Sequence, residues 1–297
     1  MLSTGGFSTL RGTRRRAMRR GTIVSMTDRL NPQASQMADE SMVRNLSAQA
    51  RAIWPQEVDL LRRYCLPESA RILDAGCGTG EITLRLAELY PCAGILGVDI
   101  IESHLDLARS RCAGFGNRVR FENRSVFDSG LPDGSFDLTV CRHLIHAIPH
   151  PDRVLAELAR VTRRGGRLHL IAEDYGMIHF EPRRLDPAGF WHEAPRSFGA
   201  AMGTDLHVGR RTPSLLRRLG LKDVTVDYVV VDTTRVPRET FAAIWEAWRD
   251  GYADIIAEQT HFTREEVISQ FDDMIGTLRE SEGYGVWFVP VVAAVVP

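Results

Sequence analysis

The sequence predicts an α/β protein whose core is a doubly wound, mainly parallel sheet. The first observation is residues 71–81, where a short apolar strand runs into a glycine-rich turn and then into a helix. The second is the series of apolar runs that follows, alternating with helically spaced apolar residues. The third is size, because 297 residues with 44% hydrophobic content are enough for one large globular domain. In such a sheet, ligands bind at the carboxyl ends of the strands.

The first strand ends in a turn suited to close contact with a ligand. Ile72 and Leu73 end the strand, and Asp74 places a carboxylate where it stops. Three glycines follow, at Gly76, Gly78 and Gly80. Because a side chain would keep the ligand away from the backbone, the turn needs residues without a Cβ.

The residue after this turn argues against a dinucleotide. A dinucleotide-binding turn requires a small residue at the sixth position of its fingerprint, which here is Glu81. A carboxylate there would crowd the helix and oppose a phosphate. The pattern therefore favours a ligand without phosphates and with a cationic amino group, and it disfavours a nicotinamide-dependent oxidoreductase.

A second acid follows at the spacing expected for a ribose contact. Residues 94–98 are predicted as the second strand, which leads to Asp99, nineteen positions after Gly80. An acid about 20 residues beyond the glycine turn is placed to accept hydrogen bonds from both ribose hydroxyls. The third strand, the fourth strand, a helix and the fifth strand are predicted at 119–121, 134–141, 151–161 and 167–172.

Taken together, these motifs resemble a known family. Asp-Ala-Gly-Cys-Gly-Thr-Gly at 74–80 is similar to the first motif of class I S-adenosylmethionine-dependent methyltransferases, and further matches follow in order as far as residue 174. The stretches 131–137 and 163–166 are similar to small-molecule members around the ubiquinone and menaquinone C-methyltransferases. The resemblance implies a seven-stranded Rossmann-like sheet with an antiparallel last strand and S-adenosylmethionine as cofactor. It also implies a small-molecule acceptor, with O, N, C or S left open as the methylated atom.

The resemblance also implies which residues bind the cofactor. They are Asp74, Gly76, Cys77, Gly78, Gly80, Asp99, Ile100, Ser125, Val126, Phe127, Cys141 and Arg142. Ile100 is expected to pack on the adenine face. Many family members bind the adenine amino group through an Asp-Ala pair, and here either Ser125-Val126 or Asp128 takes that place, depending on the register.

Candidate catalytic residues lie at the ends of the fourth and fifth strands. Methyl transfer is an in-line displacement, and a general base is needed when the acceptor is a hydroxyl, a protonated amine or an acidic carbon. His143, His146 and Glu173 are the candidates. The two histidines have a second interpretation, in which they hold the cofactor through backbone and packing. A metal site is not expected, because Pro149 breaks the helical spacing before a third histidine and no carboxylate shares it.

The chain is predicted to divide into three parts. Residues 1–27 are Arg-rich and contain no acid, which favours a disordered or artefactual head over a transit peptide or a nucleic-acid-binding arm. Residues 28–66 form a helical cap, with a helix over 31–66 that is interrupted by Pro55. Residues 67–297 form the core, in which strands six and seven at 224–231 and 286–296 enclose a helical insertion at about 232–285. The stretch from Glu173 to residue 211 is predicted as loop-like, before a short helix at 213–219.

Composition limits the classes of partner. Without six arginines of the head, the 37 basic residues fall to 31 against 38 acidic ones, so nucleic acid is an improbable partner. No apolar run approaches the length of a membrane span. Five cysteines without a Cys-x-x-Cys pair favour a reducing cytoplasm. The chain is thus expected to be cytoplasmic, with a homodimer through the helical insertion as one possibility.

Two expectations concern the acceptor and the class of function. Surplus aromatic residues in the cap and the insertion predict a lid, with Trp54, Trp191 or Trp245 within reach of the pocket. The alternative to methyl transfer is a protein of the same fold that binds the cofactor as a regulator or a cyclase, and the cofactor motifs do not separate the two.

Overall fold

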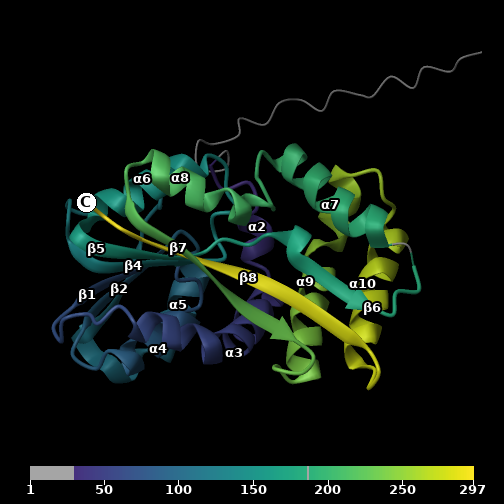
Figure 1. The fold of residues 1–297 in the computed structure, drawn as a ribbon, viewed down its shortest axis with the longest axis horizontal. Coiled ribbons are helices and arrows are strands. Elements are labelled where there is room, and N and C mark those ends of the chain that lie inside the picture. The colour runs from purple at the N-terminus through teal and green to yellow at the C-terminus, as the bar shows by residue number, and fades with distance from the viewer. Residues whose placement is uncertain (1–29, 186) are drawn as a thin grey trace, which may run out of the picture.

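The computed structural model describes residues 30–185 and 187–297 as one mixed sheet flanked by helices (Figure 1). The predicted head, residues 1–27, lies outside the described residues. The strands are β1 Arg71–Ala75, β2 Gly94–Asp99, β3 Val119–Asn123, β4 Phe136–Arg142, β5 Thr162–Ile171, β6 Ile178–Glu181, β7 Lys222–Asp232 and β8 Tyr284–Val295. The α-helices are α2 Ala34–Met37, α3 Glu40–Arg62, α4 Glu81–Leu89, α5 Glu102–Arg111, α6 Pro151–Val161, α7 Pro187–Met202, α8 Thr212–Arg218, α9 Arg238–Gln259 and α10 Arg264–Arg279. Short 3₁₀ helices are η1 Ala113–Arg118, η2 Tyr175–Met177 and η3 Val208–Arg210.

The sheet has the order β3-β2-β1-β4-β5-β8-β6, with β7 also paired to β8. Strands β1 to β5 are parallel, and β8 runs antiparallel to β5, β6 and β7. The predicted doubly wound sheet and its antiparallel last strand, slotted between the fifth strand and the 222–232 strand, are confirmed. Because β1, β2 and β4 are parallel neighbours, the residues that follow them meet at one edge of the sheet.

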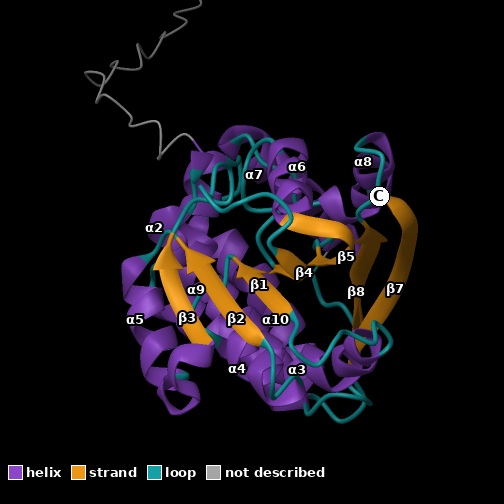
Figure 2. Cartoon of the chain, turned by 90° about the vertical axis from the view of Figure 1, so that its left-hand side faces the viewer, coloured by secondary structure: helices purple, strands orange, loops and turns teal. Residues whose placement is uncertain are grey.

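Helices cover both faces of this sheet (Figure 2). On one face, Ile72 and Ile95 of the strands pack with Leu61 of α3 and Leu86 of α4. On the other face, α6 and α8 pack against the strands through Leu155 and Leu216, among others. Parallel strands need cover on both sides, which explains why the strands read as apolar runs without alternation.

The helical cap and the helical insertion pack directly on each other. Gly251 of α9 faces Ser41 of α3, where an added Cβ would lie 2.3 Å from Ser41 Oγ. Gln33 adds a polar link, because its Nε2 donates to Ala147 O (3.2 Å) and its Oε1 accepts from Tyr252 of α9 (2.9 Å). These contacts place the N-terminal helices against both the insertion and the loop after β4.

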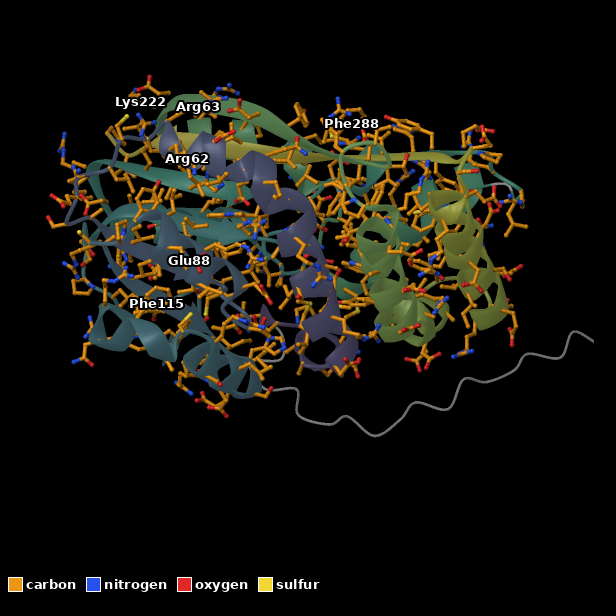
Figure 3. All side chains as sticks on the ribbon, turned by 90° about the horizontal axis from the view of Figure 1, so that it is seen from below. Arg62, Arg63, Glu88, Phe115, Lys222 and Phe288 are labelled. Atoms are coloured by element: carbon orange, nitrogen blue, oxygen red, sulfur yellow. The ribbon has the colours of Figure 1, made fainter. Side chains whose placement is uncertain are left out.

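Helix α3 also covers the outer edge of the sheet. Gln56 donates to Val230 O (2.8 Å) and accepts from Val230 N (3.1 Å), so its amide pairs with a residue of the last strand on that side. At the end of α3, Arg63 lies 3.5 Å from Asp227 of β7, and Figure 3 shows Arg62, Arg63 and Lys222 on the same side of the molecule. No helix in the described part of the chain is long and apolar enough to cross a membrane.

Two predictions of secondary structure need correction. The stretch predicted as loop-like contains β6 and α7, so the described residues form eight strands where seven were expected. Only Ile178 and Phe180 of β6 are buried, and so short an alternation does not stand out in a sequence. Pro55 does not interrupt α3, which continues through it because both halves pack on the core. The residues predicted as a helical insertion contain α9 and α10, and Thr263 caps α10 by accepting a hydrogen bond from Glu266 N.

Candidate active site

A narrow cleft of about 70 Å³ lies where β1, β2 and β4 end. It is lined in part by six of the residues predicted as site residues, namely Gly76, Gly78, Asp99, Ile100, Arg142 and His143. Met37 and Leu46 of the cap helices and Leu144 of the loop after β4 complete its walls. The structure therefore joins the glycine turn, the second acid and the end of the fourth strand in one place.

The glycine turn is folded back on the second strand. Gly76 N and Cys77 N both donate to Val98 O, at 2.8 and 3.0 Å. Gly76 and Gly78 have φ of 73° and 51°, a region that L-residues rarely adopt. An added Cβ would lie 2.7 Å from Leu144 Cδ2 at Gly76 and 2.9 Å from Leu46 Cδ1 at Gly78. The two leucine side chains thus occupy the space above the turn, and a ligand that reaches its backbone must displace them.

Asp99 presents a fixed carboxylate to this cleft. Its Oδ2 accepts from Gly78 N (2.9 Å) and its Oδ1 accepts from Ile101 N (3.0 Å). Each carboxylate oxygen keeps a second lone pair for a ligand hydroxyl. This geometry suits the ribose contact predicted from the spacing.

Asp74 lies beneath the turn rather than in the lining of the cleft. It is 2% exposed, and its Oδ2 accepts a hydrogen bond from Thr83 Oγ1 (2.6 Å). Burial raises the pKa of Asp74 to about 6. A buried carboxylate that has one hydrogen-bond partner within the described part of the chain would gain from a cationic group nearby.

The predicted adenine-binding residues do not line the cleft. Ser125 forms an isolated bridge with Asp128, and Val126 and Phe127 are buried among core residues.

Gly80 is the N-cap residue of α4 with φ 74°, and an added Cβ there would lie 2.8 Å from Ala108 Cβ. Cys77 and Cys141 are buried, and burial raises the pKa of both thiols. These residues are all surrounded by the protein itself, and their contact with a cofactor stays a prediction.

The three predicted catalytic residues meet beside the cleft. His143 Nδ1 donates to Glu173 Oε1, because an ionised carboxylate can only accept. His143 Nε2 is buried and has no hydrogen-bond partner among the residues that the structure describes. His146 Nε2 lies 3.4 Å from Glu173 Oε2. A carboxylate that orients one imidazole nitrogen leaves the other nitrogen available to take a proton.

The electrostatic balance keeps Glu173 ionised although it is 0% exposed. Burial would raise its pKa, but His146 and His143 outweigh that effect and lower it to about 2. Gln49 of α3 adds a hydrogen bond to Glu173 Oε1 (3.3 Å). Burial lowers the pKa of His146, so this imidazole is held neutral.

A second buried polar network, which was not predicted from the sequence, lies next to the first. Arg142 Nε lies 2.9 Å from Glu57 Oε1, and the same oxygen lies 2.9 Å from His169 Nε2. His169 Nδ1 in turn lies 2.7 Å from Tyr64 OH. One signal was available, because Asn45, Gln49 and Glu57 repeat at helical intervals on a face of α3 that is otherwise apolar.

The tryptophans predicted as a lid do not line the cleft. Trp54 packs beside the sheet, whereas Trp191 and Trp245 belong to an aromatic cluster around α9. Trp287 of β8 connects that cluster to the site, with ring centroids 6.0 Å from Trp245 and 6.3 Å from His143. The aromatic cluster therefore packs against His143 through Trp287.

Comparison with known proteins places the glycine turn in a recognised domain. Residues 72–166 match the family described as methyltransferase domain. A demethylmenaquinone methyltransferase of Deinococcus radiodurans is 36% identical over 34% of this chain and 42% of its own length. The chain thus spans less than half of that relative.

Solved structures show the same fold over most of the chain. A phosphoethanolamine N-methyltransferase 2 of Haemonchus contortus, in complex with S-adenosyl-L-methionine, has a TM-score of 0.56 at 17% identity and covers 89% of this chain and 60% of that one. The [4+2]-cyclase SpnF has a TM-score of 0.52 at 21% identity and covers 82% of this chain and 80% of that one. Residues 72–166 are thus similar to methyltransferase domains, and the described chain has the fold of solved proteins of that kind.

Proposed function

We propose that this protein transfers a methyl group from S-adenosylmethionine to a small-molecule acceptor. The observation that supports this most directly is the arrangement of the Asp99 carboxylate and the glycine turn, with Asp99 Oδ2 accepting from Gly78 N at 2.9 Å. The matched domain and the relatives named as small-molecule methyltransferases point the same way. The acceptor atom stays open.

The residues of the cleft fit such a cofactor. Asp99 would accept hydrogen bonds from the ribose hydroxyls, and the buried Asp74 would favour a nearby ammonium or sulfonium charge. The cofactor, when bound, supplies an electrophilic methyl group and leaves as a neutral thioether. Leu46 and Leu144 would move aside from the turn and then help to exclude water from the reacting atoms.

His143 is proposed as the general base. Its Nδ1 is held by Glu173, and its Nε2 has no partner in the described structure. As the acceptor atom forms its bond to the methyl group, its proton passes to Nε2 and is later released to solvent. Glu173 fixes the ring and stabilises the imidazolium that forms.

Binding is the first test. Calorimetry with S-adenosylhomocysteine should show saturable binding, while NAD under the same conditions should show none. Binding of NAD alone would restore the oxidoreductase interpretation and contradict the proposal.

Transfer is the second test. With methyl-labelled S-adenosylmethionine and a cell extract split into small molecules, tRNA and protein, label is expected in the small-molecule fraction. Binding without any labelled product would favour the regulatory or cyclase alternative, and label mainly in tRNA or protein would refute the substrate class.

The role of His143 is tested by making the same substitution at His143 and at an exposed histidine. His143→Gln should lower turnover about 10²- to 10⁴-fold with little change in S-adenosylhomocysteine affinity, as is typical of a lost general base. His179→Gln, at an exposed position of β6, is the control and should leave turnover unchanged. Equal effects of the two substitutions would remove His143 from the chemistry.

Assembly and location stay proposals beside this function. The homodimer through α9 and α10 is tested by sedimentation of the full chain, where a monomer at micromolar concentration would exclude it. The cytoplasmic location is tested by cell fractionation.

A further inference from the structure

A groove of about 220 Å³ lies at the amino ends of the parallel strands, on the edge of the sheet opposite the cleft. The first residues of three strands line it, namely Arg71 of β1, Gly94 of β2 and Phe136 of β4. The cleft lies where the same three strands end. Because β1 has five residues, roughly 15 Å of strand separates the groove from the cleft.

Positive charge predominates in the lining of this groove. Four arginines line it, at Arg71, Arg118, Arg120 and Arg124, and the one acid among the described lining residues is Glu122. Glu122 is already paired with Arg124, at 2.5 Å. The other three guanidinium groups form no ion pair within the described part of the chain. A cleft lined by one sign of charge concentrates ions of the opposite sign.

The protein holds three of these arginines in place. Arg118 donates three hydrogen bonds, at 3.0–3.1 Å, to backbone carbonyls at the end of α4 and in the turn after it. The guanidinium of Arg71 lies over the ring of Phe136, 5.5 Å from its centroid. Arg124 is held by its ion pair with Glu122. Side chains that are already ordered lose little conformational entropy when they bind a ligand.

Two of the arginines have guanidinium groups that make no hydrogen bond to a described residue, and they flank β2 from both sides. Arg71 pairs with Gly94, and Arg120 pairs with Leu96. Gly94 and Leu96 are two residues apart in one strand, so all four residues share a face of the sheet. An added Cβ at Gly94 would meet no atom within 4 Å, which leaves the space between the arginines open.

The floor of the groove is apolar. Leu96, Leu131 and Phe136 line it, and each is at most 9% exposed. An inorganic ion would leave this floor uncovered, whereas a ligand with an organic part beside its charge would bury it. Two free guanidinium groups suit a phosphate monoester, because it carries up to two negative charges at neutral pH and accepts paired hydrogen bonds from arginine.

We infer that this groove binds a small phosphate monoester, with its phosphate held by Arg71 and Arg120 and its organic part resting on the apolar floor. The inference goes beyond the proposed function, because the groove and the cleft share no lining residue. A nucleic acid fits less well, since the chain without its Arg-rich head carries more acids than bases.

The first test uses phenyl phosphate as the probe. Calorimetry at low salt would compare it with inorganic phosphate, which lacks the ring, and with phenol, which lacks the charge. Phenyl phosphate should bind saturably, inorganic phosphate more weakly and phenol not at all. Added salt should weaken the binding, because charges at the surface are screened. Absence of phenyl phosphate binding, or tighter binding of a single-stranded oligonucleotide, would overturn the inference.

The second test locates the ligand. Arg71→Gln and Arg120→Gln should each weaken phenyl phosphate binding roughly tenfold, as is typical of a lost hydrogen bond between charged groups. Both arginines are exposed, so the variants should melt like the wild type. Arg217→Gln, at an exposed position of α8 outside the groove, is the control and should keep the wild-type affinity. Equal affinities in all three variants would remove the phosphate from the groove.

A pair of substitutions at Gly94 separates charge from bulk. Gly94→Glu and Gly94→Gln place side chains of the same size in the open space between the arginines, and only the first adds a negative charge. Gly94→Glu should abolish phenyl phosphate binding, and Gly94→Gln should weaken it less. Equal affinities of the two variants would show that the positive charge of the groove plays no part.

Competition distinguishes this inference from the proposed function. Saturating S-adenosylhomocysteine should leave the affinity for phenyl phosphate unchanged. Competition between the two would place phenyl phosphate in the cleft and overturn the inference. A protein that binds phenyl phosphate in the groove but does not bind S-adenosylhomocysteine would overturn the proposed function alone.

Discussion

Replacing Glu173 by glutamine tests the electrostatic argument for the site most directly. The carboxylate is fully buried and is held by His143, by His146 at 3.4 Å and by Gln49 at 3.3 Å. Glu173→Gln keeps the shape of the side chain and removes its charge. The variant should therefore lose the pH-dependent part of the stability and keep most of the packing.

The magnitude follows from the pKa of Glu173. Burial alone would raise it, but the two histidines lower it from 4.5 to about 2. Such a difference corresponds to about 3 kcal/mol of unfolding free energy at neutral pH. Because the folded-state pKa is the lower one, this contribution is complete above the unfolded value of 4.5 and is lost as the pH falls towards 2. By pH 3, about 2 kcal/mol of it should be gone.

The assay is urea unfolding of both proteins at several pH values between 7 and 3. The difference in unfolding free energy between wild type and Glu173→Gln should shrink by about 2 kcal/mol over this range. Glu88→Gln, at an exposed position of α4 that Figure 3 labels, is the control and should follow the wild type. A difference that stays constant with pH would refute the view that Glu173 is held ionised.

Three further predictions concern the turn and its surroundings. Asp99→Ala should weaken S-adenosylhomocysteine binding by about 1.5–3 kcal/mol, and unchanged calorimetric affinity in a folded variant would remove Asp99 from the site. Asp74→Asn should raise the unfolding free energy at pH 7 by up to about 3 kcal/mol. Burial raises the pKa of Asp74 to about 6, so the ionised form that is present at pH 7 opposes folding. A lower melting temperature of the variant at pH 7 would contradict this. Gly209→Ala should lower the unfolding free energy of the protein by about 1–3 kcal/mol, because the added Cβ would lie 2.3 Å from Ala172 O. An unchanged melting temperature would show that the loop adapts.

Local sequence was enough to predict the parts of the site that one segment supplies. The glycine turn, Asp99 and the end of β4 each belong to a strand and the residues directly after it. Their conformation depends on strand propensity and on glycine at positive φ, which neighbouring residues determine. The parallel order of β1 to β5 then follows from the alternation of strands and helices, because crossovers place the strand ends at one edge.

The pairing of polar groups from distant segments was decided only by the tertiary structure. Glu57 of α3, Arg142 of β4 and His169 of β5 are far apart in the chain, and nothing in the local pattern of any of them marks it as a partner of the others. Likewise, β6 exists because residues 284–287 of the long last strand extend past β5 and offer it a pairing edge. The sequence by itself thus determined the sheet, the turn and the acids at its edge. Burial and long-range contacts decided which of those side chains are ionised, which face the cleft and which support it from behind.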